Sequence, residues 1–282
     1  MKRRNIFITT LLVLCMILAG CTPKDEPVKP EQKEEPPVTA VSEAEEILTK
    51  MNTAMAEKDD YLLKTELLGR METSDVRKEM QLFDECRILW MNDSMVLQGQ
   101  GNLALTAAAI ESDKKKFDNY TWQYYTEETE EGLKFFYTSD LSGKRQQETV
   151  DYPSFAELQK QVFLNEENVQ NLVMTAEGNS QLKEGCRHID LTLAPSAVPM
   201  LQVQLKQAGI VLSEGEWQNA PAVTMTLAIS PEDYTLQRVS MDCTPIFEQW
   251  LINNQIAYIE SGVTETPFMM MEIDVYYNRE IH

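Results

Sequence analysis

His188 and Asp190 are the pair of residues whose types and spacing come closest to a catalytic arrangement. They are two positions apart, so in an extended strand both project from the same face, where a carboxylate can orient a histidine that acts as a base. Such a site also needs a nucleophile, and the sequence contains no G-x-S-x-G motif or comparable setting. We therefore interpret the pair as a solvent-facing part of a strand, and we expect a protein that is not an enzyme.

Metal and cofactor sites lack the residues that they would need. Cys86, Cys186 and Cys243 are scattered and the two histidines are far apart, so no zinc-binding spacing is present. The acidic run at 127–131 contains oxygen ligands of the kind that calcium prefers, but we interpret it as a charged, solvated hairpin tip. No glycine-rich phosphate loop occurs. The sequence therefore predicts no catalytic residue, no metal site and no cofactor.

The N-terminal segment has a more specific chemistry. Three basic residues at 2–4 precede an apolar run at 6–18, which is shorter than the roughly 20 residues that span a bilayer as a helix. The run ends in LAGC at 18–21, which resembles the lipobox of a bacterial lipoprotein signal peptide. The resemblance implies cleavage before Cys21, a diacylglyceryl group on its sulfur, and a mature protein anchored by lipid to the outer face of the bacterial cytoplasmic membrane.

The segment after the lipobox is rich in proline. Residues 22–40 contain five of the twelve prolines mixed with lysine and glutamate, and little that could pack into a core. We predict a tether there, which can extend roughly 60 Å at the polyproline rise. The chain then divides into a signal peptide at 1–20, the lipidated cysteine and its tether at 21–41, and a single domain at 42–282.

The composition is strongly acidic. The formal net charge is −20, and removal of the basic residues in 1–20 brings it to about −23. Such a surface repels nucleic acid and anionic lipid head groups, so we exclude a nucleic-acid partner and expect the domain to stand clear of the membrane to which it is tethered. We expect a monomer, and the sequence identifies no protein partner.

Three of the five cysteines remain in the predicted domain. Cys15 leaves with the signal peptide and Cys21 carries lipid. The other three allow at most one disulfide bond, in any of three pairings, and have no CxxC spacing. We favour the interpretation that they are buried free thiols.

Hydrophobic periodicity predicts consecutive strands between an opening helix and a few later helices. Ser42 and Glu45 form a capping box before a helix at 43–57, in which apolar residues recur at helical spacing. Alternation of apolar and polar residues then predicts antiparallel strands, with a hairpin around the acidic run. The expected strands lie at 61–71, 80–90, 95–105, 120–125, 133–138, 187–193, 223–229, 236–243 and 269–277, and the further helices at 154–173, 196–208 and 246–252.

The order of these elements resembles that of the LolA/LppX-type lipoproteins. The resemblance rests on the lipobox, the Pro/Glu linker, the opening helix around 47–51, and the later order of strand 187–193, helix, strand 223–229, turn and strand 237–243. It covers most of the chain as a pattern of elements. It implies an α+β fold, in which helices pack on the concave face of a strongly curved antiparallel sheet, a half-barrel.

The same resemblance implies a hydrophobic ligand, such as a lipid or a lipid-linked molecule, bound between sheet and helices. The chain contains fifteen methionines, whose side chains adapt to irregular apolar partners but can equally fill an ordinary core. An alternative function is a ligand-free interaction or sensory module that docks an envelope partner through its acidic surface. The residues expected to line the ligand cavity are Met225, Leu227, Met241, Met269, Met271 and Ile273.

Overall fold

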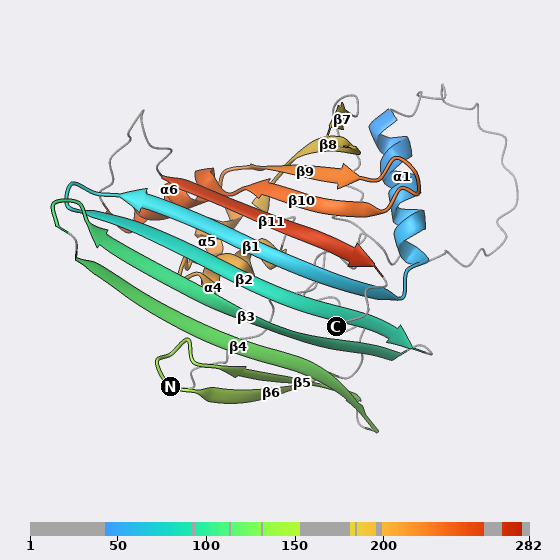
Figure 1. Ribbon diagram of the computed structural model, residues 1–282, viewed down its shortest axis with the longest axis horizontal. Helices are drawn as coiled ribbons and strands as arrows, with labels where there is room; N and C mark the ends of the chain where they lie inside the picture. The colour runs from blue at the N-terminus through green and yellow to red at the C-terminus, as the bar shows by residue number, and fades with distance from the viewer. Residues whose placement is uncertain are drawn as a thin grey trace, which may run out of the picture.

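The chain forms one large antiparallel sheet with a few short helices (Figure 1). The computed structural model describes residues 43–91, 94–112, 114–130, 132–152, 181–183, 185–195, 199–256 and 267–277. The signal segment, Cys21, the tether and the helices expected at 154–173 lie outside the described residues. The helices are α1 (Glu43–Ala56), α4 (Pro199–Gln207), α5 (Glu214–Gln218) and α6 (Thr244–Asn253). The strands are β1 (Asp60–Glu72), β2 (Val76–Met91), β3 (Ser94–Ala109), β4 (Lys115–Thr129), β5 (Gly132–Ser139), β6 (Gln146–Tyr152), β7 (Gln181–Lys183), β8 (Cys186–Leu193), β9 (Val223–Ile229), β10 (Leu236–Asp242) and β11 (Phe268–Tyr277).

Two antiparallel meanders join side by side to make this sheet. The strand order is β6-β5-β4-β3-β2-β1-β11-β10-β9-β8-β7, so neighbouring strands of the sheet are also consecutive in the sequence, except at one seam. At the seam β1 pairs with β11, and Leu67 lies opposite Met271. The first and last described strands therefore lie together at the centre of the sheet, where their pairing connects the two meanders.

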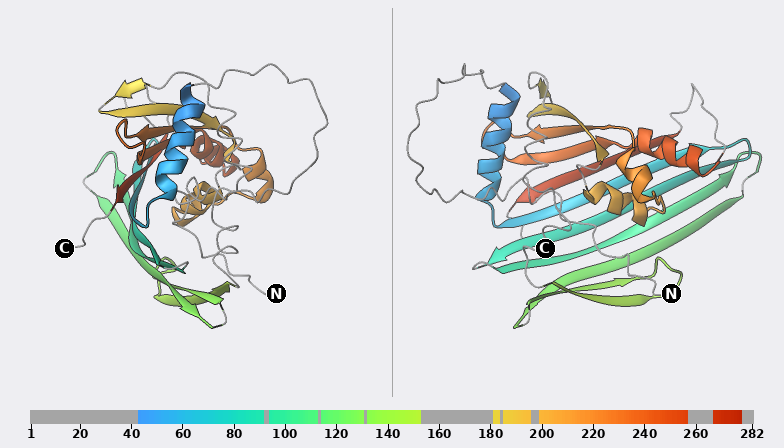
Figure 2. Two further views of the ribbon diagram at one scale, coloured as in Figure 1. Left: turned by 90° about the vertical axis from the view of Figure 1, so that its right-hand side faces the viewer. Right: turned by 180° about the vertical axis from the view of Figure 1, so that it is seen from behind.

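The sheet is arched but not strongly curled, so the expected half-barrel is wrong (Figure 2). Strong curvature requires β-bulges or kinks that interrupt strand register. The long strands β1 to β4 pair residue for residue without such an interruption. The ladder between β9 and β10 does contain a register shift, between Leu236 and Arg238. The described fold is also mostly β, and not an even mixture of helices and strands.

Alternating side chains give the sheet an inner and an outer face. In β1 every second residue from Tyr61 to Met71 is buried, and most of the residues between them are exposed or half-buried. The buried set defines the inner face, and α4, α5 and α6 all lie on that side of the sheet (Figure 2). Burial of a large aliphatic side chain contributes about 1.5–3 kcal/mol, so this face supplies most of the stability. Inner-face residues from both meanders include Leu63, Leu67, Leu82, Ile88, Leu97, Leu191, Met241 and Ile273.

Helix α1 confirms the amphipathic helix predicted near the start of the domain. The capping residue expected at Ser42 lies outside the described residues. Tyr61, at the start of β1, donates a hydrogen bond from its hydroxyl to the carbonyl oxygen of Met55 at 2.6 Å, which fixes the end of the helix against the sheet. The buried stripe of α1 consists of Ala44, Ile47, Leu48, Met51 and Met55.

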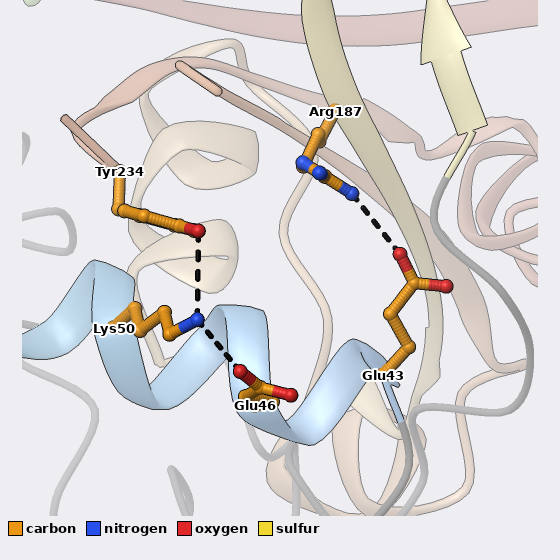
Figure 3. A network of polar contacts seen from close by, with 5 residues as sticks. All are labelled: Glu43, Glu46, Lys50, Arg187 and Tyr234. Atoms are coloured by element: carbon orange, nitrogen blue, oxygen red, sulfur yellow. Dashed lines mark hydrogen bonds and ion pairs between the residues drawn. The ribbon is translucent and has the colours of Figure 1, made fainter. Parts of the chain in front are cut away.

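A set of exposed polar contacts also connects α1 to the second meander (Figure 3). Arg187 in β8 pairs with Glu43 at 3.0 Å. Lys50 pairs with Glu46 at 2.6 Å, and its amino group also lies 3.5 Å from the hydroxyl of Tyr234 in the connection between β9 and β10. Because water and salt screen exposed ion pairs, these contacts stabilise little, and the buried stripe is the main attachment of the helix.

All three cysteines in the described residues are free thiols. Cys86 and Cys243 are buried and Cys186 is half-buried. The prediction of free thiols is therefore confirmed for all three, and the prediction of burial for two. Burial raises the pKa of the Cys243 thiol, which disfavours the reactive thiolate.

Candidate functional site

An apolar cavity of about 340 Å³ lies between the inner face of the sheet and helix α6. Its place in the fold, between sheet and helices, is where the sequence resemblance implied a ligand. Residues from three separated parts of the chain meet there. The apolar lining consists of Gly69, Met71, Met80, Leu105, Ala107, Ala208, Ile210, Phe247, Trp250 and Ile256, and charged residues at the edge include Arg70, Lys78, Glu79, Lys116 and Asp118.

The floor of the cavity is a row of residues on paired strands. Gly69, Met80 and Leu105 lie opposite one another in β1, β2 and β3. A Cβ atom added to Gly69 would lie 2.8 Å from the terminal methyl carbon of Met80 and 3.1 Å from that of Met269. The two methionine methyl groups therefore occupy the position that a side chain at Gly69 would take, so the glycine lets them pack close to the backbone of β1.

Helix α6 covers the cavity with Phe247 and Trp250, whose rings stack with centroids 6.1 Å apart. The carboxylate of Asp242 at the end of β10 accepts a hydrogen bond from the backbone N–H of Thr244 at 3.0 Å. The Thr244 hydroxyl accepts one from the backbone N–H of Met269 in β11, also at 3.0 Å. These contacts fix the start of α6 against two strands, so its aromatic side chains are held over the inner face.

Two lysines project from the inner face at the edge of the cavity. Lys78, Ala107 and Lys116 lie in one row across β2, β3 and β4, and Lys78 is also opposite the inward-pointing Met71. Lys116 pairs with Asp118 at 2.7 Å. Lys78 forms no ion pair within the described part of the chain. The site therefore combines an apolar interior with an unpaired cation at its edge.

The six residues predicted to line a ligand cavity lie together in the core of the second meander. Met225, Met241 and Met271 form one row across β9, β10 and β11, and Leu227 and Ile273 are in the next row. None of the six lines the cavity under α6. Their role as ligand contacts stays a prediction. All six are buried: Met225, Leu227, Met241, Met269, Met271 and Ile273.

Asp84 is an acidic side chain at the centre of the inner face, and it is 2% exposed. Its carboxylate accepts hydrogen bonds from Nε1 of Trp122 at 2.6 Å and from the hydroxyl of Tyr124 at 2.7 Å. Burial raises the pKa of Asp84 to about 7, although these two hydrogen bonds act in the opposite direction. Its two partners are buried aromatic side chains that donate hydrogen bonds within the core. We therefore assign this network a structural role.

Two glycines in β3 make room for the aromatic rings of this network. Gly99 lies opposite Tyr124 and Gly101 opposite Trp122. A Cβ atom at either glycine would come within 3.0 Å of the facing ring and of the backbone of β2. Because β3 has no side chains at these positions, the rings lie across the strand and reach Asp84 on the strand beyond it.

The pair His188 and Asp190 lies on β8 as predicted. Asp190 is exposed, and its carboxylate accepts a hydrogen bond from the hydroxyl of Thr226 on β9 at 2.6 Å. His188 is half-buried. Across the described ranges, no group of three or more His, Cys, Asp or Glu residues is placed to hold a metal ion.

The fold and the cavity define only a broad structural class, a single antiparallel sheet with few helices and an apolar cavity on one face. No protein-family model matches the chain, and no curated protein matches it either. Among the residues that the structure describes, no helix is both long and apolar enough to cross a membrane.

Proposed function

We propose that this protein is a membrane-anchored extracytoplasmic lipoprotein that binds a hydrophobic ligand, a lipid or lipid-linked molecule, between its sheet and its helices, in the manner of the LolA/LppX-type proteins. The observation that carries the proposal is the apolar cavity under α6. Its volume of about 340 Å³ falls within the range of about 300–1,000 Å³ that is typical of small-molecule sites. That volume suits one hydrocarbon chain, held between Met80 and Leu105 below and Phe247 and Trp250 above.

The edge of the cavity favours a ligand with an anionic head. Lys78 lies beside the apolar lining and has no counter-ion in the described residues. A lysine can pack its methylene stem along apolar surface while its amino group stays in water, where it can pair with a carboxylate or a phosphate. The chain as a whole carries a net charge of −20, so a local cation is needed for an anionic head group to bind.

Ala208→Phe is expected to weaken the binding of a fluorescent fatty acid about tenfold or more, because the new ring occupies the cavity that the hydrocarbon chain needs. Ala208 lines the cavity just after α4 and is 8% exposed. Titration of the purified protein with the probe, followed by its fluorescence, measures the effect. Ala222→Phe is the matched control, because Ala222 is exposed and does not line the cavity. Failure of the wild-type protein to bind the probe, or equal affinity in Ala208→Phe, would contradict the proposal.

Cys21→Ser is expected to release the protein from the membrane fraction without unfolding it. The hydroxyl of serine cannot receive the diacylglyceryl group, and the proline-rich segment separates this position from the domain. Fractionation of cells followed by immunodetection measures the release, and a thermal melt of the released protein measures its folding. If the variant stays in the membrane, or if it is released but unfolded, the proposed separation of anchor and domain is wrong.

A further inference from the structure

The outer face of strands β1 to β5 contains a groove of about 620 Å³. Figure 1 looks onto this face, with α4, α5 and α6 behind the sheet. The groove follows a row of paired residues that crosses the strands: Thr65, Asp84, Gly101, Trp122 and Ser139. Their side chains point to the inner face, or are absent in the case of the glycine, so the floor of the groove consists of backbone.

One wall of the groove is a row of polar side chains in register. The row runs from Lys64 through Glu85, Gln100 and Gln123 to Thr138. Lys64 and Glu85 neutralise each other in an ion pair of 2.9 Å. Gln100 and Gln123 are exposed, and neither amide has a hydrogen-bond partner within the described residues. Each amide therefore presents free donors and a free acceptor to the groove.

The opposite wall begins at Phe83 and continues through Asn102 and Thr121 to Asp140. The carboxylate of Asp140 accepts hydrogen bonds from the backbone N–H of Thr121 at 2.5 Å and from its hydroxyl at 3.2 Å. Arg145 also lines the groove and supplies a positive charge that balances this carboxylate. The two walls together are therefore close to electrically neutral, although the chain is strongly acidic.

Aromatic side chains lie in one wall and on the outer face beyond the other. Phe83 is 39% exposed on the second wall. Tyr125 and Phe136 lie on the same outer face, two residues beyond Gln123 and Thr138 along their strands, and their rings stack with centroids 4.7 Å apart. Tyr125 is 48% exposed. Exposed ring faces of this kind pack against the C–H faces of sugar rings, whose hydroxyl groups remain free for amide partners.

We propose that this groove binds an extended, uncharged polysaccharide chain that lies across the strands. Its amides and hydroxyls match sugar hydroxyl groups and its charges are balanced internally. Phe83 in one wall, and Tyr125 on the outer face beyond the other, can stack on pyranose faces. Neighbouring strands are about 4.8 Å apart, close to the length of one sugar unit in an extended β-linked chain, so successive sugars can meet successive strands. A peptide that joins a sheet instead runs along an edge strand and pairs through its backbone.

The proposal is tested with cellulose-derived and chitin-derived oligosaccharides, titrated calorimetrically into the full-length protein. We expect wild-type protein to bind at least one of them with a dissociation constant in the millimolar range or tighter. The double variant Gln100→Ala/Gln123→Ala should bind about tenfold more weakly, because it loses unpaired donors and acceptors that face the ligand. Tyr125→Ala should weaken binding in the same direction through loss of stacking.

Two further variants distinguish binding in the groove from binding elsewhere on the protein. Gln218→Ala, at an exposed glutamine on α5, is the matched control and should bind as wild type does. Ala208→Phe should also leave oligosaccharide affinity unchanged, because it fills a cavity on the opposite face of the sheet. Absence of wild-type binding to both oligosaccharides, or wild-type affinity in the folded double variant, overturns the proposal without affecting the hydrophobic site.

Discussion

Asp84→Asn is expected to remove a decrease in stability that the wild-type protein shows as the pH rises from about 4 to about 8. Asp84 is buried, and its carboxylate is in contact with two donors, Trp122 and Tyr124. Burial raises its pKa in the folded protein to about 7, whereas an aspartate in an unfolded chain has a pKa of about 3.9. The folded state therefore retains a proton that the unfolded state releases over this range.

The sign of the effect follows from this difference. The stabilising contribution of the protonated carboxyl group is fully present below the unfolded pKa and is lost as the pH rises through the folded pKa near 7. The loss is of the order of 4 kcal/mol, at about 1.4 kcal/mol per pH unit. Asparagine has the same shape and no charge. Its oxygen can accept from Trp122 while its amide donates to the hydroxyl of Tyr124, so the variant keeps both contacts.

Urea unfolding followed by tryptophan fluorescence at a series of pH values measures this prediction. The free energy of unfolding of Asp84→Asn should change less with pH than that of the wild type between pH 5 and 8, an interval of about 3 pH units. Asp75→Asn, at an exposed aspartate between β1 and β2, is the matched control and should follow the wild-type curve. If the free energy of unfolding changed equally with pH in the wild type and in Asp84→Asn, the buried carboxyl group would not be the cause of the pH dependence.

The alternation of apolar and polar residues predicted most strands, because one face of the sheet is buried along its whole length. The strands expected at 61–71, 187–193 and 223–229 agree closely with β1, β8 and β9. Strand β6 was missed because QQETVDY at 146–152 is almost entirely polar. The pairing of β1 with β11 could not be predicted, since it depends on contacts between the two ends of the domain.

A short helix was also missed although its signal is present in the sequence. Ser213 and Glu216 form a capping box at the start of α5, with the glutamate carboxylate 2.7 Å from the backbone nitrogen of Ser213. The spacing is the same as in the box predicted for Ser42 and Glu45. Five residues are too few to show hydrophobic periodicity, so only the capping motif could have indicated this helix.

An apolar cavity lies between sheet and helices, where a ligand was expected, but the six residues predicted to contact that ligand lie elsewhere in the core, and their role stays a prediction. Methionines indicated adaptable apolar surface, yet the lining of the cavity also includes small residues, Gly69 and Ala208. Hydrophobic periodicity records where large side chains lie and not where space remains between them. The inward position of Asp84 could be predicted more directly from the sequence. It lies between Leu82 and Cys86, at one of the alternate positions of its strand that otherwise hold apolar residues.

One row of residues connects the two faces of the sheet. The backbone of Asp84, Gly101 and Trp122 forms the floor of the outer groove, and the side chains of the same row build the buried network on the inner face. A Cβ atom at Gly101 would meet both the indole of Trp122 and the backbone of β2.

Gly101→Ala is expected to destabilise the protein by about 3 kcal/mol or more. The new Cβ would lie 2.5 Å from the carbonyl oxygen of Phe83 and would overlap the indole of Trp122, so the ring must move. Moving the ring breaks its hydrogen bond to Asp84, which leaves the buried indole N–H and one oxygen of the Asp84 carboxyl group without this partner. Urea unfolding at neutral pH measures the loss.

Gly215→Ala is the matched control for this substitution. Gly215 lies in α5, and a Cβ atom added there meets no atom within 4 Å. Alanine also restricts the unfolded chain and favours a helix, so this control should be neutral or slightly stabilising. Equal stability of Gly101→Ala and wild type would mean that β2 and Trp122 can shift without cost. The buried network would then be too loose to hold either face of the sheet in a fixed shape.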